Sequence, residues 1–450
     1  MVTCPFISNA WKGKRTNRAM WQPGRLAGDT ARMGLGLGLR ALGQALIFII
    51  FARTLGVEDY GAFTALIALA CFVGCFAGFG GHVLIVRDVA REPSSFPQAW
   101  GATLALLGLS TPLLMLVYLV LAWTLPIPSV PYSAVVAVGL GELIFGTTAN
   151  AASYAYRGFQ RMGRAARLQS TPVFFRLVAA AGFLLWSTTQ PSVEPPLVLW
   201  SYCYAGASLV AAMYALRLIQ QDLGKPSMPA RSLLQKWFFD GLPFSIWGVG
   251  ESLYGDADKF MLARMDSLTH AGSYAAGYRF SGMAFLPLHA LLNAAAPRLF
   301  HIGIRGLQGT RRAVLPLAPW TLGYALAVGS ALFLGAPWMA RLLGGDYSHT
   351  IVTTRWLAWL PLATTPRLLM QYALATSGRQ GTAMVAVVLG GGLNILLNCY
   401  WIPVWGWQGA ALATYAAEAG MAVTMLVLLL NIPANATERI QPTGADQCLP

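Results

Sequence analysis

Charged residues are scarce in this chain of 450 residues. Asp, Glu, Lys and Arg make up 11% of it, whereas 56% of the residues are hydrophobic and the mean hydropathy is +0.55. Soluble domains carry roughly 25% charged residues. A soluble core does not use so much apolar surface, so this composition excludes an ordinary globular protein and predicts an all-α protein that crosses a membrane many times.

Motifs of enzymes that hydrolyse ATP or make and break bonds are also lacking. The sequence has no Walker loop, kinase loop, HExxH zinc motif or nucleophile elbow. Its six cysteines form no CxxC pair, and four lie inside apolar runs, where small packing residues are expected. We therefore expect no cofactor, no metal and no enzymatic activity.

Twelve apolar segments are long enough to span a bilayer, which takes about 20 residues. These segments are 34–52, 60–81, 99–124, 132–153, 168–187, 197–217, 238–257, 273–294, 313–335, 351–374, 382–402 and 408–431. The connectors between them are short and contain no inserted soluble domain.

Basic residues outnumber acidic ones by 31 to 17, but they are not evenly spread. Most of them fall in alternate connectors, on the side that also holds the polar tail 1–32. The positive-inside rule places this side in the cytoplasm, together with the C-terminal tail 432–450. The net charge of +14 therefore reflects topology and contact with anionic lipid rather than a nucleic-acid partner.

A short pattern occurs twice, once in each half of the chain. Ala52-Arg53 is followed by Gly61, and Ala263-Arg264 is followed at the same spacing by Gly272. We expect two bundles of six helices, 33–221 and 237–431, joined by a cytoplasmic linker at 222–236. Since each bundle begins on the inner side, a pseudo-two-fold axis along the membrane normal would relate them.

Longer stretches resemble a known family. They are ARTLGVEDYGAFTALIALA at 52–70, LPFSIWGVGESLYGDADKFMLARM at 242–265, AGSYAAGYRF at 271–280, LLGGDYSHTIVTTRWLAW at 342–359, and the ending of 374–418. In this order they resemble the polysaccharide biosynthesis, O-antigen-type flippases of the multidrug/oligosaccharidyl-lipid/polysaccharide exporter superfamily. The likeness covers about residues 33–431.

The resemblance implies a function for the whole chain. Members move undecaprenyl-diphosphate-linked oligosaccharide across the bacterial inner membrane, for O-antigen, capsule or exopolysaccharide biosynthesis. The implied mechanism is alternating access around a site between the two bundles. A polysaccharide polymerase and glycosyltransferases are the implied protein partners.

Arginines inside the apolar segments are the candidate substrate-binding residues. A diphosphate crossing hydrocarbon needs fixed positive charge, and the planar guanidinium pairs phosphate oxygens in a bidentate way. We assign this role to Arg40, to Gln44 one turn further on, to Arg176 and to Arg279. Arg40 has an equally good alternative, which is to extend to the inner surface.

Acidic residues inside the segments are candidates for gating or ion coupling. They are Glu142, Glu251, Asp256 and Asp258. Three readings stay open for them: an ion pair between the bundles that breaks on opening, a protonatable coupling site, and a static pair between helices. For Glu418 we expect a packing role, while the role of Arg367 is open.

Two other functions compete with the flippase. A multidrug and toxin extrusion-type cation antiporter would need a net acidic cavity, whereas five arginines and five acids lie in or beside the segments here. A membrane-embedded glycan polymerase or transferase would need a large outer loop with catalytic residues, and the connectors are short. The sugar, the coupling ion and the oligomeric state are not determined by the sequence.

Overall fold

The computed structural model describes the backbone of residues 23–431, apart from 190–194, 290, 293–298, 300–309, 311–313 and 378. Side chains are described from residue 42 onward, with 187–194 and 431 also left out. All regular secondary structure in these ranges is helical. The all-α fold class predicted from composition is therefore confirmed for the described part of the chain.

The helices follow one another with short connections. Before the linker they are α2 (Pro23–Gly74), η1 (Ala77–Gly80), α3 (Gly81–Arg91), η2 (Pro93–Ser95), α4 (Phe96–Thr124), α5 (Tyr132–Gly139), the π-helix η3 (Leu140–Gly146), α6 (Thr147–Gly158), α7 (Met162–Thr189) and α8 (Pro196–Asp222). After it they are α9 (Arg231–Met265), α10 (Leu268–Ala284), η4 (Leu315–Leu317), α13 (Ala318–Leu343), η5 (Gly345–Tyr347), α14 (Ser348–Leu357), α15 (Leu360–Thr376), α16 (Gln380–Trp405) and α17 (Trp407–Asn431).

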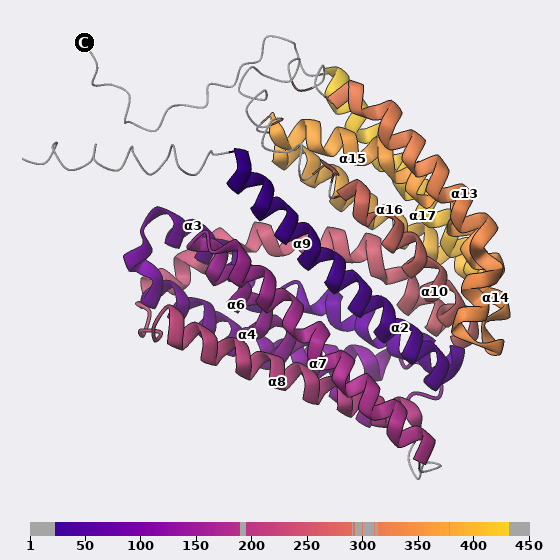
Figure 1. The fold of residues 1–450 in the computed structure, drawn as a ribbon, viewed down its shortest axis with the longest axis horizontal. Coiled ribbons are helices and arrows are strands. Elements are labelled where there is room, and N and C mark those ends of the chain that lie inside the picture. The colour runs from indigo at the N-terminus through magenta and orange to yellow at the C-terminus, as the bar shows by residue number, and fades with distance from the viewer. Residues whose placement is uncertain are drawn as a thin grey trace, which may run out of the picture.

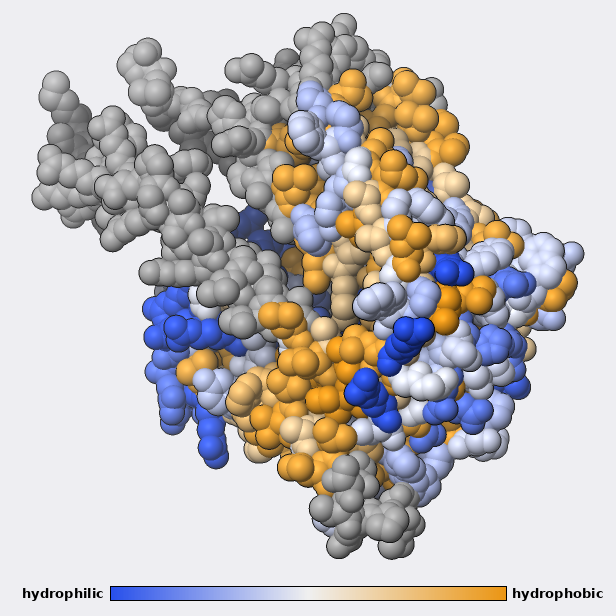
Figure 2. Space-filling model, turned by 45° about the vertical axis from the view of Figure 1, so that its right-hand side comes forward, coloured by the Kyte–Doolittle hydropathy of each residue, from blue (hydrophilic) through white to orange (hydrophobic). Residues whose placement is uncertain are grey.

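Eight stretches of the described chain are long and apolar enough to cross a membrane. They are Leu42–Gly74, Pro93–Thr124, Tyr132–Gly158, Met162–Trp186, Pro196–Asp222, Leu315–Leu343, Gln380–Trp405 and Trp407–Leu430. On the face shown in Figure 2, hydrophobic residues cover the middle and hydrophilic residues gather towards the two ends. The chain is a multi-pass membrane protein.

The expected count of twelve spans differs from these eight for identifiable reasons. The first stretch contains two of the expected segments, because α2 continues through a bend. The helix α9 carries Glu251, Asp256, Asp258 and Lys259, and α14 is separated from α15 at residues 358–359. The helix α10, in the expected span 273–294, is only 17 residues long. The arrangement as twelve crossings in two bundles therefore remains a proposal.

Two long helices lie between the others. Figure 1 shows α2 running diagonally between a group formed by α3, α4, α6, α7 and α8 and a group formed by α10 and α13–α17. The helix α2 packs on α7, α9 and α10, and α9 packs on α16 as well. Buried aromatic side chains, among them Phe48, Phe51, Phe63 and Trp200, join these helices into one apolar core.

The first predicted connector is much shorter than expected. We expected separate helices at 34–52 and 60–81, but one helix runs through both and leaves helical geometry at Gly56. Its φ of 76° lies in the left-handed region, which glycine adopts without steric cost. A single residue is therefore sufficient to turn the chain between the two segments.

A second break ends the helix before the predicted residue 81. Gly78, Phe79 and Gly80 have φ values of 67°, 45° and 68°. The break brings the Phe79 carbonyl against α9, where a Cβ on Gly241 would lie 1.8 Å from that oxygen. Glycine at 241 thus allows a backbone contact between two long helices that no larger residue permits.

The two copies of the sequence repeat pack directly against each other. A Cβ on Gly61 would lie 2.2 Å from the carbonyl oxygen of Leu268, and a Cβ on Gly272 would lie 2.0 Å from that of Val57. Thr269 donates a hydrogen bond of 3.0 Å to Glu58, which lies 211 positions earlier in the chain.

The contacting residues are equivalent positions of the two repeats. Glu58 and Thr269, Gly61 and Gly272, and Val57 and Leu268 are each 211 positions apart. Equivalent positions facing each other across a contact are the mark of a two-fold axis. A local two-fold contact therefore relates the repeats where α2 meets α10.

The glycine contact predicts opposite effects for the same substitution at two positions. Alanine normally stabilises a helix by up to about 1 kcal/mol relative to glycine. Gly61→Ala instead places its methyl group against a carbonyl, so we expect a loss of about 1–3 kcal/mol, as in an overpacked core. The measurement is thermal unfolding of the purified protein in detergent.

Gly282→Ala on α10 is the matched control, because nothing lies within 4 Å of an added Cβ there. We expect this variant to unfold at the wild-type temperature or above it. Equal melting temperatures for the two variants would contradict a close backbone contact at Gly61.

Candidate functional site

Charged residues inside the fold collect in three groups, which we name after their acids. The Glu142 cluster contains Glu142, Arg176, Tyr204 and Ser208. The Asp258 cluster contains Asp256, Asp258, Lys259, Tyr274 and Tyr278. The Glu418 cluster contains Glu418, Arg367, Tyr254, Thr364 and Gln371.

In the Glu142 cluster, one expected substrate-binding residue is paired with an expected coupling residue. Arg176 Nη2 lies 3.0 Å from Glu142 Oε1 and 3.1 Å from Ser208 Oγ, and its guanidinium carbon is 4.0 Å from the centre of the Tyr204 ring. The Tyr204 hydroxyl also donates to Glu142. Arg176 Nε has no partner among the described residues. Most of the Arg176 charge is therefore balanced within the protein.

The π-helix η3 places this acid. π-Helical turns inside α-helices are rare, and they often mark functional positions. Glu142 lies in the first turn of η3, between α5 and α6, and α8 packs against the same turn. No signal in the sequence indicated this turn.

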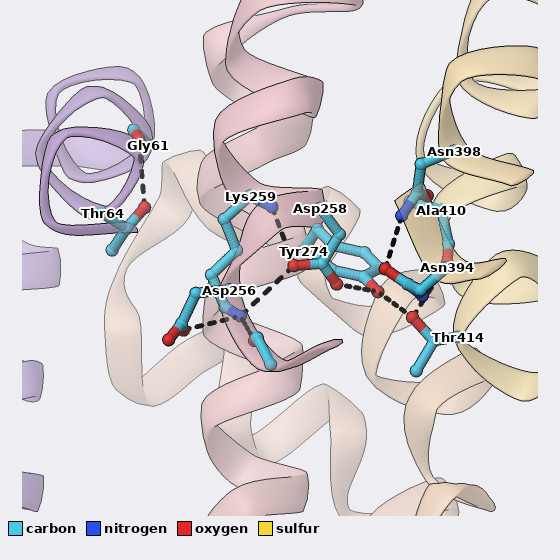
Figure 3. Close-up of polar contacts among 11 residues, drawn as sticks. Gly61, Thr64, Asp256, Asp258, Lys259, Tyr274, Asn394, Asn398, Ala410 and Thr414 are labelled. Atoms are coloured by element: carbon cyan, nitrogen blue, oxygen red, sulfur yellow. Dashed lines mark hydrogen bonds and ion pairs between the residues drawn. The ribbon is translucent and has the colours of Figure 1, made fainter. Parts of the chain in front are cut away.

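The Asp258 cluster is held mainly within α9 (Figure 3). Asp258 is fully buried, and its Oδ1 accepts the backbone N–H of Lys259 at 2.8 Å while Oδ2 accepts the Tyr274 hydroxyl at 2.8 Å. Lys259 Nζ lies 3.4 Å from Asp258, 3.3 Å from Asp256 and 4.0 Å from the centre of the Tyr278 ring. Asp256 and Asp258, two of the four acids expected to act in gating or ion coupling, thus both pair with a lysine of their own helix.

Polar residues of α16 and α17 extend this cluster (Figure 3). The Tyr274 hydroxyl lies 3.3 Å from Thr414 Oγ1, and Asn398 Nδ2 donates to Asn394 Oδ1 at 2.9 Å. Asn394 Nδ2 and Asn398 Oδ1 have no partners in the part of the chain that the structure describes, although both residues are fully buried. Burying an amide group without a partner costs free energy. The two amide atoms beside the Asp258 cluster therefore remain available for further hydrogen bonds.

The Glu418 cluster corrects the packing role expected for this acid. Arg367 Nε lies 2.6 Å from Glu418 Oε2, and Thr364 Oγ1 donates to Oε1 at 2.6 Å. The Tyr254 hydroxyl donates to the same carboxylate, and Arg367 Nη1 donates to Gln371 at 2.8 Å. Both charged residues are buried. Arg367, whose role the sequence left open, is therefore the counter-ion of Glu418. This ion pair joins α15 to α17.

Arg279 differs from these arginines. It is exposed, and its guanidinium carbon lies 5.5 Å from the centre of the Phe48 ring on α2. No carboxylate of the described residues forms an ion pair with it, in contrast to Arg176 and Arg367. Its charge is therefore available at the contact between α10 and α2.

The other expected residues lie apart from these clusters. Gln44 is half-buried, one turn before Phe48 on α2. Arg40 belongs to the same helix, but its side chain lies outside the described residues. Glu251 on α9 is exposed and has no hydrogen-bond or ion-pair partner in the described ranges.

One further ion pair joins α3 to α9 and was not expected from the sequence. Arg87 Nη1 lies 3.1 Å from Asp240 Oδ2, while Trp237 Nε1 donates to Asp88 at 3.1 Å. The partners are about 150 positions apart, so no local pattern indicates the contact. It lies beside the Phe79–Gly241 backbone contact, which it reinforces.

The fold is similar to those of solved membrane proteins. The structure titled lipid II flippase MurJ, inward closed conformation, superposes with a TM-score of 0.68 at 14% identity, over 89% of this chain and 88% of that one. An inward-facing multidrug resistance MATE family transporter of the MOP superfamily gives 0.67 at 15% identity, over 87% and 94%. At such identities the likeness concerns the fold.

The sequence itself identifies the family. A family model described as polysaccharide biosynthesis protein matches residues 29–302, which is more than half of the chain. The protein belongs to this polysaccharide biosynthesis family. It is also 23% identical over 386 residues to the probable low-salt glycan biosynthesis flippase Agl15 of Haloferax volcanii, covering 84% of this chain and 77% of that protein.

The buried pair in the Glu418 cluster predicts a large effect for a single neutralisation. Glu418→Gln leaves the buried Arg367 charge without its counter-ion, and breaking such a pair costs about 3–5 kcal/mol. We expect a lower melting temperature in detergent. The double variant Arg367→Met/Glu418→Gln removes both charges, so it should recover a large part of this loss.

Glu251→Gln on α9 is the control, because that acid is exposed and lacks a partner among the described residues. It should melt close to wild type. A double variant less stable than Glu418→Gln alone would contradict a stability role for the ion pair.

Proposed function

We propose that this protein is a flippase that carries undecaprenyl-diphosphate-linked oligosaccharide across the bacterial inner membrane by alternating access. The observation that carries the proposal is the unpaired positive charge of Arg279 where α10 meets α2. Membership of the polysaccharide biosynthesis family and the likeness to a glycan biosynthesis flippase support it.

An unpaired arginine inside a membrane protein suits a diphosphate. Placing a charge in hydrocarbon is costly, so such residues usually pair with an acid or serve a ligand. The guanidinium fork of Arg279 matches the phosphate oxygens of the lipid carrier. The Phe48 ring beneath it is buried in the core, so it supports the guanidinium and leaves the fork of Arg279 to contact the ligand.

Neighbouring positions on α2 would extend this site. Arg40, Gln44 and Phe48 follow one another at intervals of one helical turn, so they belong to one face of α2. Gln44 would then bind sugar hydroxyls, and Arg40 a second phosphate. Arg176 is the weaker candidate, because Glu142 already balances most of its charge.

The proposed plan has twelve crossings in two bundles, 33–221 and 237–431, with the linker 222–236 and the tails 1–32 and 432–450 in the cytoplasm. In this topology the Gly61–Gly272 contact lies at the outer end of the bundles and closes the site on that side. The neighbours titled inward-facing and inward closed are consistent with such a state. Alternating access then requires the repeats to separate at these glycines.

The acids would couple this motion to an ion. The Asp258 cluster lies where α9, α10, α16 and α17 meet, so a change in its charge would act on their packing. Asp256 and Glu251, on the same helix but more exposed, would connect it to solvent. Glu142 would have this role in the first bundle.

The charge balance favours an anionic substrate over a cation antiporter. Glu142, Asp258 and Glu418 are each paired with a basic residue of the chain. A cation-binding cavity would instead keep such buried acids free. Of the five acids in the spans, only the exposed Glu251 lacks a partner among the described residues. Unpaired positive charge at Arg279 is the opposite arrangement.

Replacing Arg279 tests the proposed substrate site. In cells that lack their own copy of the gene, Arg279→Ala should fail to restore surface polysaccharide, and lipid-linked repeat units should accumulate. Losing one charge-assisted contact to phosphate corresponds to about tenfold or more in binding. Arg279→Lys should restore part of the export, because it keeps the charge without the fork.

Arg264→Ala is the matched control, since Arg264 is an exposed arginine near the end of α9. It should export normally at an equal level in the membrane. Full export by a well-expressed Arg279→Ala protein would remove this residue from the site, whereas loss of drug resistance without lipid-linked intermediates would favour the antiporter.

A reversible cross-link tests alternating access separately. The side chains of Glu58 and Thr269 already touch across the two-fold contact, at 3.0 Å. In the Glu58→Cys/Thr269→Cys variant, a short bifunctional thiol reagent with a cleavable disulfide should stop export, and reduction should restore it. Each single cysteine variant, treated in the same way, controls for reaction at the native thiols. Undiminished export by the cross-linked protein would show that this contact does not need to open.

A further inference from the structure

A surface cleft separate from the central site lies where α13, α14 and α17 meet. It has a volume of about 430 Å³. Its lining residues are Phe333, Val352, Arg355, Trp356, Trp359 and Tyr415. Phe333, Val352 and Trp356 are exposed, and only 22% of the apolar stretch that contains α13 is buried within the protein. The cleft therefore opens on the outside of the bundle, towards the surrounding lipid.

A single basic residue provides the polar chemistry of the cleft. The guanidinium carbon of Arg355 lies 5.2 Å from the centre of the Phe333 ring, and Nε points to the Phe333 carbonyl at 3.4 Å. Among the described residues it has no carboxylate partner, unlike Arg176 and Arg367. An exposed arginine held against an aromatic ring keeps most of its donors available for an anion.

The aromatic walls are fixed in place by contacts of their own. The Tyr415 hydroxyl donates to the Trp356 carbonyl at 2.5 Å, which ties α17 to α14. On α13, a Cβ at Gly329 would lie 2.9 Å from the Ala358 carbonyl oxygen and 3.1 Å from the Trp359 ring. Glycine there lets Trp359 lie against the backbone of α13. The cleft is thus preformed, which lowers the entropic cost of binding.

The cleft lies two to three helical turns inside the helix ends, because Phe333 precedes the end of α13 at Leu343 by ten residues and Arg355 follows the start of α14 at Ser348 by seven. A phosphate held by Arg355 would therefore lie below the level of the other lipid head groups. The helix α13 ends at Leu343, where η5 leads into α14, and the turn at Gly406 between α16 and α17 lies near Trp356, which packs on Trp407 at 5.7 Å. Exposed tryptophans such as Trp338 and Trp405 lie near these helix ends. Tryptophans concentrate at membrane–water interfaces, where the phosphates of the lipids also lie.

We propose that this cleft binds an anionic phospholipid of the surrounding leaflet. Arg355 would hold the phosphate, and the head group would lie beside the Tyr415 hydroxyl. An acyl chain would run over Val352, Phe333 and the two tryptophans, which together present far more apolar than polar surface. The bound lipid would brace α14 against α13 and α17.

The test is native mass spectrometry of the purified protein in detergent, with phosphatidylglycerol as the probe and phosphatidylcholine as the zwitterionic comparison. Arg355→Gln should weaken phosphatidylglycerol binding by about tenfold, the size of one charge-assisted contact. Arg341→Gln is the matched control, because Arg341 is an exposed arginine on the last turn of α13 and does not line the cleft. Binding that is equal in the two variants would overturn the proposal.

A second lipid and a second pair of variants complete the test. Undecaprenyl phosphate is titrated in parallel, and a dependence on Arg355 for this lipid without one for phosphatidylglycerol would overturn the assignment to a phospholipid. If Arg355→Gln does not fold, Trp356→Leu is compared with Trp338→Leu, whose tryptophan lies outside the cleft. Weaker phosphatidylglycerol binding by Trp356→Leu supports the site, and equal binding overturns it.

Discussion

Charge inside an apolar bundle has to be balanced, and this constraint organises the interior of the protein. Glu142, Asp258 and Glu418 each have a basic partner and at least one hydroxyl donor. Leaving one of these charges alone in a medium of low polarity would cost several kcal/mol. The three clusters therefore fix which helices pack together, because each draws its residues from more than one helix.

The same need for charge balance makes the two arginines without an acidic partner candidates for binding an anion. Arg279 and Arg355 are exposed arginines held against aromatic rings, without a carboxylate among the described residues. One lies where α10 meets α2, and the other in a cleft on the outer surface. The proposed site for a diphosphate at Arg279 and the proposed site for a lipid phosphate at Arg355 rest on the same reasoning about charge.

Close backbone contacts at glycines are the second feature that determines how the helices pack. Gly61 and Gly272 bring α2 and α10 within reach of each other's carbonyl groups, and Gly241 does the same for α9 at the break near Phe79. Such contacts need no side-chain interlocking, so the helices on either side can pack closely and still separate. This property suits the alternating access that we propose.

The sequence by itself determined the class of protein and its repeat. Hydropathy predicted a helical membrane protein, because the cost of unpaired backbone groups in lipid leaves few alternatives. The repeated Ala-Arg and glycine pattern marked Gly61 and Gly272, and the internal charges marked Arg176, Asp258 and Arg279. These signals rest on residue type and on spacing along the chain, and none of them requires knowledge of which helices pack together.

Only the tertiary structure decided which of these residues pair. Arg176 has Glu142 as its partner, and Glu418 is the counter-ion of Arg367 rather than a packing residue. Asn394 and Asn398 were missed, although their spacing of one helical turn was visible, because polar residues in a helix gain significance from what faces them. Partners far apart in the chain are selected by the packing of whole helices, and no single segment of the sequence carries that information.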